Sequence, residues 1–235
     1  MANYSLEMSS AVSTGWEYAK KYGLLIAVIY FVVSMLTGGL QHMSGGLNMS
    51  DSQALGEAIG KSDWQSVAAI LETSNNSFAS HFGTCFACLI NVLVSVGLYN
   101  MALGLMNGRY SEVTFDAFKL PLAVYAKMFV VDLIVSIICI VSACFCIIPV
   151  FFVAPRLILA PVYQVDNPEA GIIESISAAW KMTSGNTFSM LGLGVIMFGV
   201  ACLGVLCCCI GVYFAEAIEL LTLVAAYYQL KGNLQ

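Results

Sequence analysis

The chain has 235 residues, of which 60% are hydrophobic and only 10% are charged, and its formal net charge is −5. A soluble domain carries roughly 25% charged residues, so this composition offers too little polar surface for a water-soluble protein. The acidic balance also provides no basic patch for a nucleic acid. We therefore predict an all-α integral membrane protein.

Six segments are long and apolar enough to span a bilayer, which takes about 20 mainly apolar residues. The polar stretch 41–84 separates the first two and is predicted to be an extracytoplasmic loop. Pro155 and Pro161 fall within the fourth segment, where neighbouring helices can satisfy the freed carbonyls. Residues 1–235 are thus predicted to form one membrane domain with spans at 22–40, 85–106, 120–141, 147–162, 187–205 and 210–230.

The distribution of positive charge predicts the orientation of these spans. With the N-terminus inside, only Lys61 lies on the outer side. The opposite orientation would reverse that ratio, so we expect both termini in the cytoplasm. The residues then on the inner side are Lys20, Lys21, Arg109, Lys119, Lys181 and Lys231.

Two segments, 1–21 and 167–185, have the 3.6-residue apolar period of helices that lie along a membrane surface. Trp16 stands eight residues before Leu24 and Trp180 eight residues before Phe188, each just ahead of a predicted span, and both would anchor at headgroup level. Gly185 suits the end of the second helix, and Asn186 follows it at the start of the span.

These two lead-in segments resemble each other, and Phe115 holds a similar place before the third span. One interpretation is an internal repeat of three units, each a surface helix followed by a pair of spans. The alternative is that any amphipathic lead-in ends with an aromatic residue at the interface.

The sequences IIPVFFVAPRLILAPVYQVDN and GIIESISAAWKMTSGNTFSMLGL, within residues 147–193, resemble a broad bacterial family of six-span membrane proteins. That family includes the membrane domain attached to some glycerophosphodiester phosphodiesterases, and many members of unknown function. Ala178 and Ala179 depart from its pattern, where a basic residue and a serine are common. The resemblance implies the bacterial cytoplasmic (inner) membrane and carries over no catalytic residue. The matching positions are Pro149, Arg156, Pro161, Asp166, Glu174, Trp180, Thr183, Gly185 and Asn186.

Polar and charged residues inside spans are costly and often functional. Asp132, Glu216 and Glu219 lie within predicted spans, as do Asn91 and Arg156. The three carboxyl groups could form a polar pathway or a pocket for a proton or cation. The alternative, which we prefer, is an interhelical clamp such as Arg156 with Asp132, or carboxyls kept protonated by apolar surroundings.

Nine cysteines are present, and Cys85 and Cys88 form a C-x-x-C at the start of a predicted span. Such a dithiol is used by membrane thiol-disulfide oxidoreductases, and thiolates such as those of Cys207, Cys208 and Cys209 suit a soft metal. Cysteine is also ordinary packing material between membrane helices. We favour a passive or structural role and predict no metal or other cofactor.

Three classes of function follow from these features. The first, which we favour, is a non-catalytic protein of the bacterial cytoplasmic membrane acting in envelope organisation, lipid handling or partner assembly. Its partners would be the lipid bilayer and either another protein or a second copy of the chain, and no nucleic acid. The alternatives are a transporter or channel component that uses the intramembrane carboxyls, and a thiol-disulfide oxidoreductase that uses Cys85 and Cys88.

Overall fold

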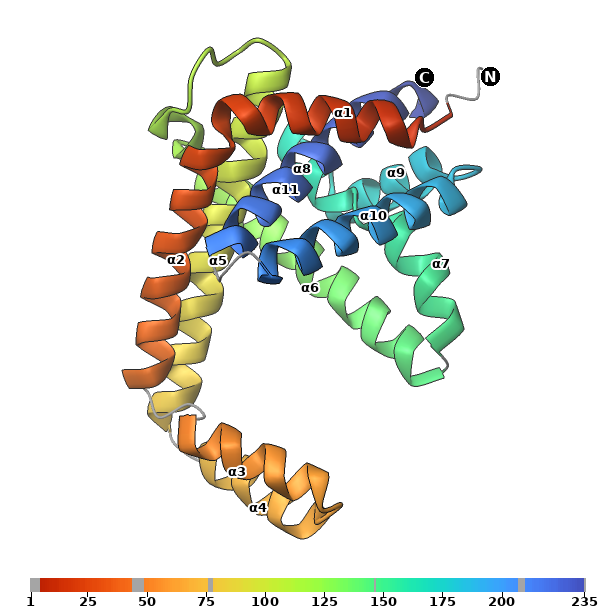
Figure 1. Cartoon of the computed structure of the whole chain (residues 1–235). Helices are drawn as coiled ribbons and strands as arrows, with labels where there is room; N and C mark the ends of the chain where they lie inside the picture. The colour runs from red at the N-terminus through yellow and green to blue at the C-terminus, as the bar shows by residue number, and fades with distance from the viewer. Residues whose placement is uncertain (1–4, 44–48, 76–77, 146, 207–209, 235) are drawn as a thin grey trace. The chain divides into compact units, whose positions relative to one another are not determined.

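The structure is a computed structural model that describes residues 5–43, 49–75, 78–145, 147–206 and 210–234. Every regular element in these ranges is helical (Figure 1). The elements in chain order are α1 (Met8–Tyr18), the π-helical segment η1 (Ala19–Gly23), α2 (Leu24–Met43), α3 (Met49–Gly60), α4 (Trp64–Asn75), α5 (Phe78–Met106), the 3-10 turn η2 (Phe115–Phe118), α6 (Leu122–Phe145), α7 (Ile147–Leu157), α8 (Ala160–Asp166), α9 (Ile172–Thr183), α10 (Thr187–Leu206), α11 (Ile210–Leu230) and the 3-10 turn η3 (Lys231–Leu234).

Five helical stretches within the described ranges are long and apolar enough to cross a membrane. Their exposed faces carry large apolar side chains, as expected where lipid rather than water is the solvent. The chain is therefore an all-helical multi-pass membrane protein. The five stretches are Met8–Gly39, Cys85–Met106, Leu122–Ser142, Thr187–Leu206 and Gly211–Leu230.

The predicted fourth span, 147–162, is divided between α7 and α8, with 11 and 7 residues. Pro161 explains the break, because it has no N–H to bond the carbonyl of Leu157 and its ring clashes with that carbonyl. α7 accordingly ends at Leu157, and Pro161 stands in the first turn of α8, where proline is favoured. The six-span count thus stays a prediction.

The chain forms two compact units, and the prediction of a single membrane domain stays a prediction. One comprises Met1–Phe31 with Leu93–Gln235, and the other comprises Val32–Val92. In the second unit α3 packs against α4. Asp63 caps α4, because its carboxylate accepts hydrogen bonds from the Ser66 backbone N–H (3.2 Å) and hydroxyl (2.6 Å).

The larger unit is organised around α11, which packs against α1 and α10. α1 lies close to α11 because Gly15 meets Thr222, where an added Cβ would stand 2.8 Å from the Thr222 Cα. The chain then turns between α1 and α2, as Figure 1 shows, through the wide π-helical segment η1.

Both ends of the described chain lie at the same end of this unit (Figure 1). The Leu6 N–H donates to the side-chain oxygen of Asn186 (3.0 Å) between α9 and α10. The Glu7 N–H donates to the side-chain oxygen of Gln229 (3.1 Å) near the end of α11. These bonds hold the start of α1 beside the C-terminal turn of the last helix.

The two predicted surface helices are present as α1 and α9, each with one packed face and one exposed face. α9 buries small or flexible residues such as Ala179 and Met182, whereas Ile173 and Trp180 are 81% and 42% exposed. The predicted apolar face is thus split between packing and exposure. Whether either helix lies in a membrane interface stays a prediction.

Candidate functional site

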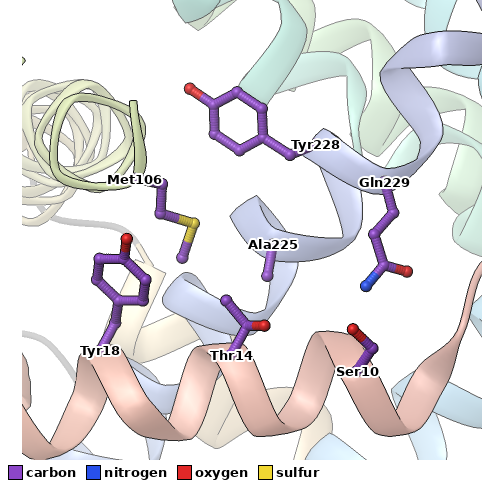
Figure 2. Close-up of a pocket in the computed structure, with 7 residues that line it drawn as sticks. All are labelled: Ser10, Thr14, Tyr18, Met106, Ala225, Tyr228 and Gln229. Atoms are coloured by element: carbon purple, nitrogen blue, oxygen red, sulfur yellow. The ribbon is translucent and has the colours of Figure 1, made fainter. Parts of the chain in front are cut away.

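A cavity of about 360 Å³ lies between α1 and α11, at the end of α5. Figure 2 shows its lining. None of the lining side chains is charged, and five of the seven can form hydrogen bonds. The lining residues are Ser10, Thr14, Tyr18, Met106, Ala225, Tyr228 and Gln229.

The residues that α1 contributes to the lining recur with the period of the helix. Ser10, Thr14 and Tyr18 are spaced four residues apart and therefore share one face of the helix. The neighbouring face of α1 contains the small residues Ala11 and Gly15, which are buried. These small residues let α1 approach α11 closely, and this approach places the hydroxyl-bearing face of α1 over the cavity.

α11 supplies the opposite side with two side chains that are held in place. The Tyr228 hydroxyl donates to the Leu103 carbonyl of α5 (3.1 Å). The Gln229 side-chain oxygen accepts the Glu7 N–H (3.1 Å), and its amide nitrogen has no hydrogen-bond partner among the described residues. In Figure 2 this nitrogen points toward the space beside Ser10 and Thr14. The cavity thus presents neutral donors and acceptors in fixed positions.

A second cluster of polar side chains surrounds the connection between α8 and α9, and its role is structural. The Lys127 ammonium, from α6, donates to the carbonyls of Pro168 (2.7 Å) and Ala170 (3.2 Å). The buried Gln164 accepts from the Ser175 hydroxyl (2.8 Å) and donates to the Ala170 carbonyl (3.3 Å). Each of these polar groups already has a partner.

Asp166, at the end of α8, adds a further polar contact near this connection. Its carboxylate accepts from the Tyr227 hydroxyl (2.7 Å) and from the Lys231 ammonium (2.5 Å), and its side chain is only 7% exposed. A buried carboxylate with two such donors is satisfied. Asp166 therefore ties α8 to the end of α11 rather than facing a ligand.

The three predicted intramembrane carboxyls are half-buried in the larger unit. Tyr30 lies within electrostatic range of Glu216, Glu219 and Tyr99. Tyr99 in turn lies within range of Asp132. Tyr30 thus lies in the vicinity of the two carboxyls of α11, and Tyr99 in the vicinity of the carboxyl of α6. Asn91 is exposed and belongs to the smaller unit.

Arg156 makes no ion pair with Asp132, so the clamp that the sequence suggested does not form between these two described residues. Its Nε donates instead to the Thr187 hydroxyl (3.0 Å) at the start of α10. Its guanidinium stacks over the Trp180 ring at 4.5 Å from the centroid. The physical reason is position: Arg156 stands at the end of α7, next to the α9–α10 junction.

The predicted anchor residues also have defined roles. Trp16 is 44% exposed, close to the 42% of Trp180, and the Lys20 ammonium lies 5.7 Å from its ring centroid. Gly185 has a φ of +85°, a left-handed conformation that favours glycine. Asn186, which follows it, holds the N-terminal segment through Leu6.

Cys85 and Cys88 are exposed free thiols in the smaller unit, which contains no other cysteine. Cys207, Cys208 and Cys209 lie outside the described residues. Among the residues that are described, no group of three His, Cys, Asp or Glu side chains is placed to hold a metal ion.

The sequence analysis predicted neither the cavity nor the role of Lys127. The hydroxyl residues four apart in α1 were a signal for the cavity, but their partner on α11 is more than 200 residues away in the chain. For Lys127 the available signal was a charge inside a predicted span, but its carbonyl partners are 41 and 43 residues away in the chain.

Comparison with known proteins found no family model, curated protein or solved structure that matches this chain. The class of this protein is defined by its fold and its cavity: it is an all-helical multi-pass membrane protein with a neutral polar cavity.

Proposed function

We propose that this chain is a non-catalytic lipid-handling protein of the bacterial cytoplasmic membrane. The cavity between α1 and α11 holds a neutral, hydroxyl-rich lipid headgroup, such as the glycerol of a diacylglycerol or the sugar of a glycolipid. The observation that carries this proposal is the convergence of the Ser10 and Thr14 hydroxyls with the free amide nitrogen of Gln229.

The position of the cavity along the candidate spans favours a lipid over a soluble ligand. Met106 is the last residue of α5, and Gln229 is the second last of α11, so the cavity lies where two candidate spans end. The ends of spans coincide with the headgroup region of a bilayer. The exposed Trp16 on α1 also suits this level.

The chemistry of the lining favours hydroxyl groups over charged ones. Hydroxyl and amide side chains both donate and accept hydrogen bonds, as a sugar or glycerol does. Arg109 and Asp166, of opposite charge, both lie within electrostatic range of Tyr228, so neither sign dominates near the cavity. A volume of about 360 Å³ falls in the usual range for small-ligand sites.

The proposed topology has six spans with both termini in the cytoplasm. Leu6 and Glu7 contact Asn186 and Gln229, which supports two termini on one side of the membrane and hence an even number of crossings. Five helical stretches are long enough to span, and the broken segment α7–α8 would supply the sixth crossing. This topology also agrees with the resembling bacterial family.

The test is lipid retention by the purified full-length chain in nanodiscs, read by native mass spectrometry. We expect a monoglucosyl diacylglycerol or dioleoylglycerol to be retained in preference to phosphatidylcholine. The double variant Ser10→Ala/Thr14→Val should lower that retention about tenfold, because two hydrogen bonds are lost.

Ser9→Ala is the matched control, because Ser9 is exposed on another face of α1 and does not line the cavity. It should retain lipid as the wild type does. Equal retention by the double variant and the wild type, or no preference for either hydroxylated lipid, would contradict the proposal.

A second candidate is a pathway for protons or cations, favoured by Tyr30 and Tyr99, which lie in the vicinity of Glu216 and Glu219 and of Asp132. It predicts that the reconstituted protein accelerates proton or cation flux into liposomes and that Glu219→Gln abolishes this flux. Liposomes with and without protein that show the same flux, measured with a pH- or cation-sensitive dye, would exclude it.

The thiol-disulfide class gains no support, since Cys85 and Cys88 have no second cysteine pair in their unit.

A further inference from the structure

The Arg156 guanidinium is a half-buried positive charge with most of its donors unused. An arginine side chain carries five N–H donors. Only the Nε–H is bonded, to the Thr187 hydroxyl (3.0 Å). The four terminal N–H groups have no hydrogen-bond partner among the residues that the structure describes.

No carboxylate neutralises this charge within the described ranges. The ion pairs found there use Lys61, Lys119 and Lys231, each with its own Asp or Glu. Trp180 covers one face of the guanidinium, with 4.5 Å between Arg156 Cζ and the ring centroid. An indole face attracts a cation but cannot accept its in-plane N–H bonds.

The contacts fix the direction in which those donors can act. The Nε bond to Thr187 and the stacking on Trp180 lock the guanidinium plane, so its terminal edge is preorganised. Two large apolar side chains near the α9–α10 junction are exposed, Trp180 to 42% and Phe188 to 74%. Lys181, the residue after Trp180 in the chain, is also exposed.

We infer that Arg156, stacked on Trp180, binds an oxyanion of the phosphate class, supplied by the headgroup of an anionic phospholipid. Two parallel N–H···O bonds from one guanidinium edge match two oxygens of a phosphate. The apolar surface formed by Trp180 and Phe188 accommodates the adjoining acyl chain. This site is separate from the cavity under α1 and does not rest on the function proposed for that cavity.

The test measures the binding of phosphatidylglycerol to the full-length protein in phosphatidylcholine nanodiscs by native mass spectrometry. Arg156→Gln should weaken phosphatidylglycerol binding about tenfold or more, because charge-assisted bonds to the phosphate are lost. Lys20→Gln is the matched control, since Lys20 also contacts an exposed tryptophan but is itself exposed, in η1. It should bind as the wild type does.

A second arm distinguishes a lipid from free phosphate. Inorganic phosphate is titrated against the wild type and Arg156→Gln in discs of pure phosphatidylcholine, with the thermal midpoint as readout. A midpoint that rises only in the wild type, without preference for phosphatidylglycerol, keeps the oxyanion site and makes free phosphate its source. The inference is overturned if Arg156→Gln binds both probes as the wild type does, or if the wild type binds neither.

Arg156→Lys covers the case in which Arg156→Gln fails to fold. It keeps the positive charge but replaces the planar fork with a single point donor. Several-fold weaker phosphatidylglycerol binding supports the bidentate site, and unchanged binding rejects it.

Discussion

At the scale of single residues, Lys127 shows how one charge inside a span can be used for structure. Its ammonium reaches the carbonyls of Pro168 and Ala170, which lie in the connection between α8 and α9. Backbone carbonyls left unbonded in a half-buried place are costly. Lys127 therefore fixes the position from which α9 starts.

We predict that Lys127→Met lowers the free energy of unfolding by about 1–3 kcal/mol, since hydrogen bonds to a charged donor contribute about that much. The measurement is the midpoint of thermal or denaturant unfolding of the detergent-solubilised protein. Lys119→Gln, which breaks the fully exposed pair with Asp116, serves as the control and should leave the midpoint unchanged. Equal effects of the two substitutions would show that the carbonyl contacts contribute nothing.

Asp63 is a single residue whose contribution to stability depends on pH. The Ser66 hydroxyl and then the Ser66 backbone N–H stabilise its carboxylate, which lowers the pKa of Asp63 below its usual value. For a carboxyl with a lowered folded pKa, the stabilising contribution is fully present above the unfolded pKa of about 3.9. It is lost as the pH falls through the folded pKa.

We accordingly expect the first turn of α4 to lose amide protection only when the pH falls below the usual aspartate range. Ser66→Ala should raise the pKa of Asp63 toward its usual value, measured by carboxyl NMR titration. The pKa of Asp116, which is lowered by Lys119, should not move in this variant and serves as the control. An unchanged Asp63 titration in Ser66→Ala would refute the capping role.

At the scale of elements, the contact between α1 and α11 decides whether the cavity exists. Gly15 has no side chain, and Thr222 on α11 is fully buried against it. The Thr222 hydroxyl has no hydrogen-bond partner in the described structure, so close packing, and not a polar bond, holds this contact. Membrane helices commonly approach each other through such small residues.

We predict that Gly15→Ala destabilises the protein by about 1–3 kcal/mol, because overpacking forces the backbones apart. The new Cβ would stand 2.8 Å from the Thr222 Cα, which is backbone and cannot rotate away. The thermal midpoint should fall, and lipid retention in the cavity should fall with it.

Gly194→Ala is the corresponding control in α10, since an added Cβ there meets nothing within 4 Å. It should leave the midpoint unchanged or raise it slightly, because alanine favours a helix over glycine by roughly 0.5–1 kcal/mol. A midpoint for Gly15→Ala as high as that of Gly194→Ala would show that α1 and α11 are not closely packed.

At the scale of the whole molecule, the contacts of the N-terminal segment bear on topology. Leu6 and Glu7 are bonded to groups at the start of α10 and the end of α11. These bonds support the proposed topology, in which both termini share one side of the membrane and the number of crossings is even. In that topology the short, proline-containing α7–α8 segment would complete the sixth crossing, although neither helix is long enough alone.

Reporter fusions test this topology. Fusions of green fluorescent protein to either terminus should fluoresce, which requires a cytoplasmic location, and alkaline phosphatase at either terminus should be inactive. Alkaline phosphatase inserted after Lys61, between α3 and α4, should be active. Termini on opposite sides of the membrane would rule out six spans and favour five.

The amino-acid sequence alone determines that this chain is a helical membrane protein, because a 60% hydrophobic composition leaves no other solvent for its surface. The periods of α1 and α9 and the positions of Trp16 and Trp180 were also readable, since they depend on local helical spacing. The break between α7 and α8 follows from Pro161, whose effect is likewise local.

The tertiary structure decided which polar groups are satisfied and which are left available. Arg156 meets Trp180 and Thr187 rather than Asp132, and Lys127 meets two carbonyls more than 40 residues away in the chain. The cavity forms because Gly15 lets α1 approach α11, which brings Ser10 and Thr14 opposite Gln229. Such pairings depend on contacts between distant segments, and residue spacing carries no information about them.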